Sequence, residues 1–398
     1  MPQSAIASRQ RPGAALAAAT ILSLPLGSIY AFSVFLAPLE QLLSASRSEL
    51  ASVFGISVIF FTLGLNLAPW LFGLIPVAAI VALSAGLAAA GVGIAALAND
   101  FAQLAFGYGV LFAFGGGLAY VGAQQSVNAT PITRPGLVNG YLVSLFPLGA
   151  MIAAPAFGWG IDHYGVRTTL AGLAVTVALC GAAATVLMAM SGVQLSRPGR
   201  IGEAAAGGAE ARRQTSVFWK LFLVFTFAAT AGLMVLSQVA AMLVAYGTTK
   251  ATALAATTGI TGAIAGARIA GGLLADRMPV PYVAASAQAI ALAGAVLLSL
   301  VPTPEMAIPT LGMIGVGYGL ISGVTAAAVA FYWPKALFGQ TASRIYIAWC
   351  LAALTLPVVA ARLFDMTGGY HTAILLAGCA NLCGVVVGLS LPKQTRQT

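Results

Sequence analysis

The chain reads Ala263-Ile-Ala-Gly-Ala-Arg-Ile-Ala-Gly-Gly-Leu-Leu-Ala-Asp-Arg277, an apolar run that Arg268 interrupts and an Asp-Arg pair ends. A guanidinium keeps its proton at any workable pH, so protein, water or an anionic ligand must solvate it. Placing such a charge inside a membrane costs about 2.5 kcal/mol or more, which makes an intramembrane arginine a candidate functional residue. Arg268 is the only one of the 18 Lys and Arg residues that we place deep inside an apolar span.

Composition indicates a membrane protein. Sixty per cent of the residues are hydrophobic, 7% are charged, and the mean hydropathy is +0.97. A soluble domain carries about 25% charged residues, whereas apolar runs of about 20 residues match the thickness of a bilayer. The first run is too long for the core of a signal peptide, so we treat it as a retained span. The sequence predicts an all-α integral membrane protein with twelve spans, at 14–38, 50–69, 74–98, 101–126, 136–159, 168–191, 217–246, 253–275, 280–301, 305–330, 341–363 and 371–391.

The net charge of +9 is distributed unevenly between the expected loops. Only Arg47, Arg167, Lys250 and Arg362 fall on one side, and the remaining loop Lys and Arg residues fall on the other. Because basic residues are retained in the cytoplasm, both termini are expected there, in a multi-pass protein of the cell inner (plasma) membrane. The positive charge is therefore a topology signal and does not indicate a nucleic-acid partner. The expected partners are membrane lipid and a small-molecule organic anion, and a monomer is expected.

The organisation of the chain is twofold. A Gly- and Ala-rich stretch at 192–216 is the expected cytoplasmic linker between six-span bundles at 1–191 and 217–398. Asp162-His-Tyr-Gly165 recurs as Asp365-Met-Thr-Gly368 at an offset of 203, and Gly115-Gly-Gly-Leu118 recurs as Gly317-Tyr-Gly-Leu320 at an offset of 202. Parallel repeats of this kind are typical of transporters whose substrate site lies between the halves.

The segment Gly272-Leu-Leu-Ala-Asp-Arg277 resembles the loop motif G-x-L-x-D-R of the major facilitator superfamily, here between spans eight and nine. The resemblance implies the twelve-helix, two-repeat fold of that superfamily, a transport function, and a conformational latch at Asp276 and Arg277. The first-half copy departs from the motif, because the stretch Asn66-Leu-Ala-Pro-Trp-Leu-Phe-Gly73 has no Asp-Arg pair.

Within the superfamily the chain most resembles the oxalate/formate antiporter and monocarboxylate transporter group. Four stretches carry this likeness: 27–35 with 47–50, 115–120, the arginine in span eight, and 364–370. The resemblance implies that Arg268 binds a carboxylate. Oxalate carriers have a second cation, a lysine, in span eleven, whereas Tyr346-Ile-Ala-Trp-Cys-Leu-Ala-Ala-Leu354 has none. One arginine can hold one carboxylate in a bidentate pair, so a monocarboxylate is favoured over a dianion.

Helical spacing and the family positions supply candidates for the rest of a binding site. Hydroxyl and amide groups can hold a polar ligand head, and aromatic faces can enclose its apolar part. Besides Arg268, the candidate substrate-binding residues are Tyr30, Tyr120, Gln124, Thr261, Tyr318, Tyr346 and Trp349.

Several kinds of functional residue are missing from the positions where a proton-coupled carrier, a metalloprotein or an enzyme would need them. The nine acidic residues all fall at span ends or in loops, so no carboxylate is placed to carry a proton through the membrane. No His/Cys spacing indicates a metal, no cofactor is implied, and no nucleophile–base arrangement indicates an enzyme. We expect a carrier of a small organic monocarboxylate, by exchange, facilitated diffusion or proton-linked symport. The alternatives are a carrier of a larger solute, such as an aromatic acid or a riboflavin-like vitamin, and a non-transporting membrane sensor.

Overall fold

The computed structural model describes residues 10–197 and 208–394, which are almost entirely helical. Apart from one isolated bridge between Phe72 and Ile75, these residues contain no β pairing. Eleven of their helices are long and apolar enough to cross a membrane. A helix satisfies its backbone hydrogen bonds internally, which lipid requires of any spanning segment. The predicted all-α membrane fold is confirmed.

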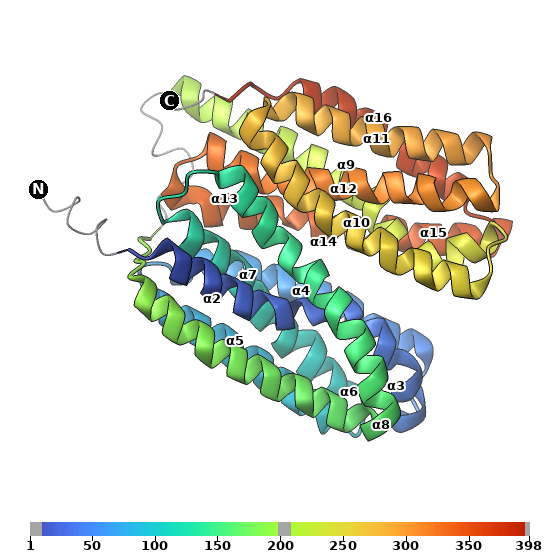
Figure 1. The fold of residues 1–398 in the computed structure, drawn as a ribbon, viewed down its shortest axis with the longest axis horizontal. Coiled ribbons are helices and arrows are strands. Elements are labelled where there is room, and N and C mark those ends of the chain that lie inside the picture. Colours follow the sequence, from blue (N-terminus) through green and yellow to red (C-terminus); the bar gives the residue numbers. More distant parts are fainter. Residues whose placement is uncertain (1–9, 198–207, 395–398) are drawn as a thin grey trace, which may run out of the picture. The chain divides into compact units, whose positions relative to one another are not determined.

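The elements before the linker are coloured blue to green in Figure 1. They are α2 (Pro12–Leu26), the 3₁₀ segment η1 (Gly27–Phe35), α3 (Leu36–Leu43), α4 (Arg47–Leu71), α5 (Val77–Ala96), α6 (Phe101–Leu104), the π-helical segment η2 (Ala105–Phe112), α7 (Ala113–Asn128) and α8 (Pro135–Ser191).

The elements after the linker are coloured yellow-green to red in Figure 1. They are α9 (Gly208–Ala245), α10 (Lys250–Arg277), α11 (Val280–Leu300), α12 (Pro304–Tyr332), the 3₁₀ turn η3 (Lys335–Leu337), α13 (Phe338–Ile345), α14 (Ile347–Leu354), α15 (Leu356–Thr367) and α16 (His371–Leu389).

Several expected spans differ in detail from single regular helices. The 57-residue α8 is broken at Gly165, whose φ of 80° is left-handed, so α8 contains both expected spans 136–159 and 168–191. The first span tightens into 3₁₀ geometry at Gly27, shortly after Pro25 removes a backbone donor. Span eleven is divided between α13, α14 and α15. With α8 counted as two spans, the described residues accommodate the twelve that the sequence predicts.

The chain groups into two compact units by its internal contacts. Unit 1 consists of Met1–Thr133, Leu145–Gly199 and Lys335–Ser343, and unit 2 of Arg134–Ser144, Arg200–Pro334 and Arg344–Thr398. The start of α8 therefore belongs to unit 2 and the start of α13 to unit 1. The bundle boundaries expected from the sequence remain a prediction. Within the expected linker, residues 198–207 lie outside the described residues, and α9 begins at Gly208.

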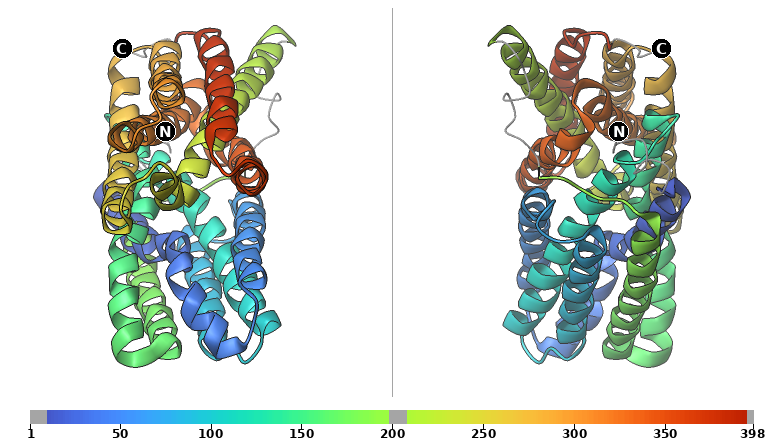
Figure 2. Two further views of the ribbon diagram at one scale, coloured as in Figure 1. Left: turned by 90° about the vertical axis from the view of Figure 1, so that its right-hand side faces the viewer. Right: turned by 90° about the vertical axis from the view of Figure 1, so that its left-hand side faces the viewer.

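Glycines of the sequence repeat have the same packing role in both units. A Cβ atom added to Gly115 in α7 would lie 2.6 Å from the carbonyl oxygen of Ser84 in α5. A Cβ added to Gly317 in α12 would lie 2.6 Å from the carbonyl oxygen of Ala287 in α11. Small residues let helix backbones approach closely in membranes, where burial of apolar surface does not drive helices together. In unit 2, α11 lies beside both α12 and α16 (Figures 1 and 2).

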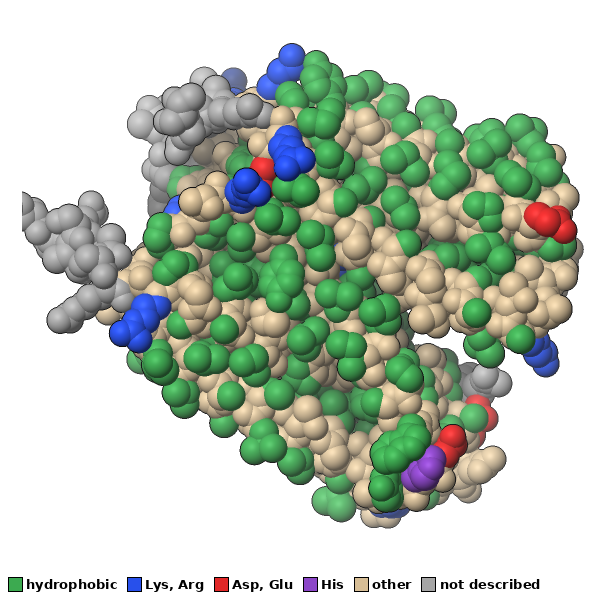
Figure 3. All heavy atoms as spheres, viewed as in Figure 1, with side chains coloured by type: hydrophobic (Ala, Val, Ile, Leu, Met, Phe, Trp, Pro, Cys, Tyr) green, Lys and Arg blue, Asp and Glu red, His purple; other side chains and the backbone are tan. Residues whose placement is uncertain are grey.

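The outer surface is apolar. In Figure 3, hydrophobic side chains are spread over the whole visible face, whereas charged side chains are few and scattered. Large side chains such as Trp70 and Leu300 are 71% and 73% exposed. A soluble protein rarely exposes so much contiguous apolar surface. The exposed apolar side chains are suited to contact with lipid tails.

The close approach at Gly317 predicts a measurable loss of stability. Gly317→Ala forces α12 away from α11 and should reduce the unfolding free energy by about 1–3 kcal/mol, seen as a lower midpoint of thermal unfolding in detergent. Gly312→Ala in the same helix is the control, because its added Cβ would meet nothing nearer than Ile260 at 4.0 Å. Equal midpoints for the two variants would contradict this account of the packing.

Candidate functional site

Arg268 lies in α10 where three helices of unit 2 approach each other through small residues. Its side chain is only 4% exposed. A Cβ added to Gly140, near the start of α8, would lie 2.5 Å from the carbonyl oxygen of Arg268, and one added to Gly323 of α12 would overlap the same oxygen. The backbones of α8 and α12 therefore contact α10 directly, and the arginine side chain extends from the point where they meet.

The guanidinium of Arg268 donates hydrogen bonds to a backbone carbonyl and to a phenol. Its Nη1 donates a hydrogen bond of 2.8 Å to the carbonyl oxygen of Val143 in α8. Its Nη2 donates one of 3.3 Å to the hydroxyl of Tyr318 in α12, and its Cζ lies 5.4 Å from the centre of the Tyr318 ring. Both groups are uncharged, and the ring adds a cation–π contribution. The structure thus brings together two predicted site residues, Arg268 and Tyr318.

The side chain of Tyr318 packs closely against α9. The tyrosine is 1% exposed, and a Cβ added to Gly232 would lie 2.6 Å from its Cδ1 atom. Only glycine leaves room for the ring at this position of α9. The contact with α9 therefore limits the positions open to the ring whose hydroxyl bonds to Arg268.

Three other predicted residues of unit 2 lie in α10 and in or near α14. The hydroxyl of Thr261 donates to the carbonyl of Thr257 one turn earlier in α10, at 2.8 Å. Tyr346, between α13 and α14, packs its ring edge-on against Phe225 with ring centres 5.8 Å apart. Trp349 in α14 is 8% exposed. Their roles in substrate binding remain predictions.

The predicted aromatic residues of unit 1 surround a residue that the sequence did not single out. The ring of Phe146 in α8 lies edge-on to Tyr30 and Tyr120, with ring centres 6.4 Å and 5.0 Å apart. Phe61 of α4 also contacts both Tyr120 and Phe146. Gln124, one turn after Tyr120 in α7, is 1% exposed. Phe146 therefore joins two of the predicted site residues into one aromatic cluster.

Asp276 caps the start of α8. Its two carboxylate oxygens accept hydrogen bonds of 2.8 Å each, one from the backbone N–H of Gly136 and one from that of Leu137. These N–H groups belong to the first turn of the helix, where they have no partner within the helix and where the helix dipole favours negative charge. Arg277, the other half of the predicted latch, has an exposed side chain.

A second helix start, in unit 1, is capped by an uncharged side chain. Gln125 of α7 accepts a 2.6 Å hydrogen bond from the N–H of Gly339 in α13 and donates one of 2.9 Å to the carbonyl of Lys335. The ammonium of Lys335 in turn donates to the carbonyl of Thr130 at 2.9 Å. Gly136 and Gly339 are 203 residues apart, the offset of the sequence repeat, and the same offset relates Asp276 to Gly73. An amide from α7 thus caps the helix whose counterpart in unit 2 is capped by a carboxylate.

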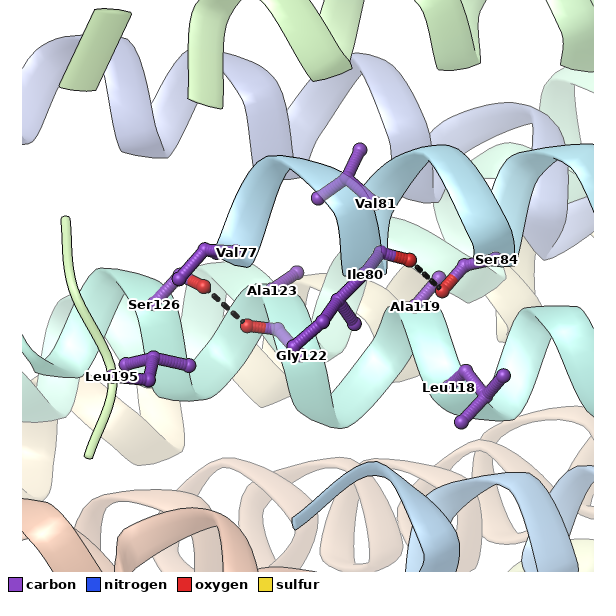
Figure 4. A pocket seen from close by; sticks show the side chains of 10 residues that line it. All are labelled: Val77, Ile80, Val81, Ser84, Leu118, Ala119, Gly122, Ala123, Ser126 and Leu195. Atoms are coloured by element: carbon purple, nitrogen blue, oxygen red, sulfur yellow. Dashed lines mark hydrogen bonds between the residues drawn. The ribbon is translucent and has the colours of Figure 1, made fainter. Parts of the chain in front are cut away.

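A narrow apolar crevice in unit 1, too tight to hold a water molecule, lies between α5, α7 and Leu195. The hydroxyls of Ser84 and Ser126 face it, but each donates to a carbonyl of its own helix, at Ile80 and Gly122 (Figure 4). Both serine hydroxyls of the lining therefore have partners within their own helices. Across residues 10–197 and 208–394, no group of three or more His, Cys, Asp and Glu side chains could hold a metal ion.

Comparisons with known proteins give one family and one fold. The sequence model of the Major Facilitator Superfamily matches residues 16–357. The solved proton:xylose symporter XylE, bound to 6-bromo-6-deoxy-D-glucose, superposes with a TM-score of 0.74 at 14% identity, covering 96% of each chain. The transporter FucP, solved in its outward conformation, superposes with a TM-score of 0.72 at 13% identity, covering 96% of this chain and 100% of that one. A variant of the same protein, the Escherichia coli fucose:proton symporter, gives a TM-score of 0.71 at 14% identity, covering 96% of this chain and 99% of that one. No curated protein sequence matches the chain at a significant level.

Proposed function

The chain belongs to the major facilitator superfamily, and we propose that it carries a small organic monocarboxylate across the membrane. The family and the fold make it a multi-pass membrane carrier that works by alternating access. The substrate class is our inference from the residues of unit 2. The positive-inside pattern supports an orientation with both termini in the cytoplasm, in the inner (plasma) membrane.

The observation that carries the proposal is the buried guanidinium of Arg268 between Val143 and Tyr318. A carbonyl and a phenol are both uncharged, so a carboxylate that replaces one of them forms a charge-assisted bond, about twice as strong as a neutral one. The planar fork of the guanidinium matches the two oxygens of one carboxylate. We assign Arg268 as the carboxylate-binding residue and Tyr318 as the hydroxyl that orients it.

A neutral solute would make less use of this charge. The structural neighbours XylE and FucP are symporters of xylose and fucose by name, and a sugar is neutral. Burying a cation without an anionic ligand is unfavourable unless other groups satisfy it. A larger solute such as an aromatic acid would still use Arg268, and the predicted contacts Tyr30, Tyr120 and Trp349 would enclose its ring. Competition for uptake by acids and by neutral solutes distinguishes an anionic substrate from a neutral one.

Arg268→Ala should abolish carboxylate uptake into liposomes and leave membrane insertion intact, because the binding charge is lost and an insertion cost is removed. Arg268→Lys should reduce uptake by about tenfold or more, since an ammonium lacks the bidentate fork. Arg362→Ala, at an expected loop end, is the control for loss of one positive charge. Uptake that persists in Arg268→Ala would rule out the assignment.

Because Arg268 is the one cation that we assign to the site, we expect the carrier to prefer substrates with a single carboxylate over dicarboxylates. Acetate and lactate should compete with a labelled monocarboxylate substrate at lower concentration than oxalate or malonate, whose second charge would be buried without a cation. Stronger competition by the dianions would indicate a second cation at the site. Competition by xylose or riboflavin, but by none of the acids, would show that the substrate is a neutral solute and would contradict the proposal of a monocarboxylate.

We propose that the Asp276 cap is a latch whose strength differs between the carrier's states. Asp276→Asn keeps the shape of the side chain but removes its charge, so the cap on α8 loses a stabilisation of about 0.3–1 kcal/mol. Only an interaction that differs between states can shift their populations. Spin-label distances across the cytoplasmic ends of the helices should change in this variant, whereas the ranking of competing solutes should not.

Asp162→Asn removes an exposed carboxylate elsewhere in α8 and serves as the control. Unchanged distances together with an altered solute ranking would place Asp276 in the binding site and contradict its role as a latch.

A further inference from the structure

The carbonyl of Val143 that binds Arg268 lies four residues before a proline. In an α-helix, the carbonyl of residue i accepts the N–H of residue i+4. For Val143 that residue is Pro147, which lies inside α8 and has no N–H. The helix therefore cannot supply the usual donor, and the Nη1 of Arg268 occupies the carbonyl instead, at 2.8 Å.

The carbonyl of Val143 and the guanidinium of Arg268 each give the other a hydrogen-bond partner. A carbonyl without a donor in a lipid-embedded bundle costs free energy because no water replaces the missing partner. A guanidinium has five N–H donors and cannot be neutralised by losing its proton. The close contact of α8 and α10 at Gly140 places the carbonyl within reach of the arginine. Pro147, the carbonyl of Val143 and the guanidinium of Arg268 therefore form one arrangement, although Arg268 is far from the other two residues in the sequence.

We propose that Pro147 is a positioning residue: by leaving the Val143 carbonyl open, it provides Arg268 with a resting partner that a substrate carboxylate must displace. The displacement part rests on the proposed function, whereas the dependence of the Val143–Arg268 bond on Pro147 does not. The carbonyl is then an internal competitor. It holds the guanidinium in place without substrate. The apparent affinity for a carboxylate is thereby reduced to the intrinsic affinity multiplied by the fraction of molecules in which the carbonyl is not bound to Arg268.

Displacement also links substrate binding to α8. When a carboxylate takes the Nη1 donor, the first turns of α8 lose one of their attachments to α10, while the Asp276 bonds to Gly136 and Leu137 persist. The bond that breaks joins the charged Arg268 to a neutral carbonyl, whereas the bond that forms joins Arg268 to a negatively charged carboxylate. The exchange therefore favours the substrate. Binding energy is thereby used in part to loosen α8 from α10.

The first test is a double-mutant cycle on the thermal unfolding of the ligand-free carrier in detergent. Pro147→Ala restores an N–H that can bond to the Val143 carbonyl. The rise in unfolding midpoint from this change should be larger in Arg268→Ala, where the carbonyl has lost its donor, than in the wild type, where Arg268 already occupies it. Pro147→Leu, a second helix-forming residue with an N–H, should give the same coupling if the amide, and not side-chain volume, is responsible.

Pro155→Ala is the matched control. Pro155 lies in the same helix, eight residues further on, so the carbonyl that it leaves open is about 12 Å along the axis from that of Val143. Its effect on the midpoint should be the same with and without Arg268. Equal shifts for Pro147→Ala in the two backgrounds would overturn the positioning role of Pro147.

The second test measures lactate and acetate binding to the same variants. If the carbonyl competes for Arg268, Pro147→Ala should tighten monocarboxylate binding about tenfold or more, as expected for removal of one hydrogen bond to a charged group. Pro155→Ala should leave the affinity unchanged. Unchanged affinity in Pro147→Ala, with the thermal coupling present, would overturn the displacement step. Coupling present but no carboxylate binding in any variant would refute the proposed function and leave the Pro147–Arg268 arrangement standing.

Discussion

The constraint on which unit 2 depends is the solvation of one buried positive charge. Arg268 cannot be neutralised, and its side chain is almost fully enclosed by helices. The surrounding elements supply what it needs: α8 contributes a carbonyl that the helix does not use, α12 contributes a phenol and an aromatic face, and α9 packs against that phenol at Gly232. The small residues around Arg268 follow from the same requirement, because only close backbone contact brings these groups within bonding distance.

Close backbone contact is also what the repeat in the sequence encodes. Gly115 and Gly317 each remove a side chain from the same kind of helix crossing, one in each unit. A repeat of charged or aromatic residues would be easier to recognise, but glycine is the residue that such a crossing demands, since no other side chain fits between the backbones. The two units thus share the close helix contacts at these glycines, even where their polar and charged residues differ.

The two helix starts capped from α7 and α10 show that difference directly. In unit 2 a carboxylate, Asp276, accepts two N–H bonds from α8, and in unit 1 an amide, Gln125, accepts one from α13. The carboxylate gains from the helix dipole, whereas the amide gains little from it and instead makes a second bond, to Lys335. The loss of the acidic residue from the first-half loop motif is accompanied by a cap from a different helix. The two caps should therefore respond differently to salt and to loss of charge.

The sequence alone indicated the all-helical membrane class, the twelve spans and the twofold repeat, and it singled out Arg268 and Asp276 as candidate functional residues. These rest on local properties: the length of apolar runs, the cost of a charge within them, and a short motif with a fixed position between spans. Only the tertiary structure decided that Arg268 binds Val143, that Phe146 joins Tyr30 to Tyr120, and that Gln125 caps α13. Within α8, Pro147 leaves the Val143 carbonyl without its helical donor, and the fold supplies Arg268 as the partner. Which donor reaches a given carbonyl depends on the register between helices far apart in the chain, and hydrophobic patterning within one helix carries no information about that register.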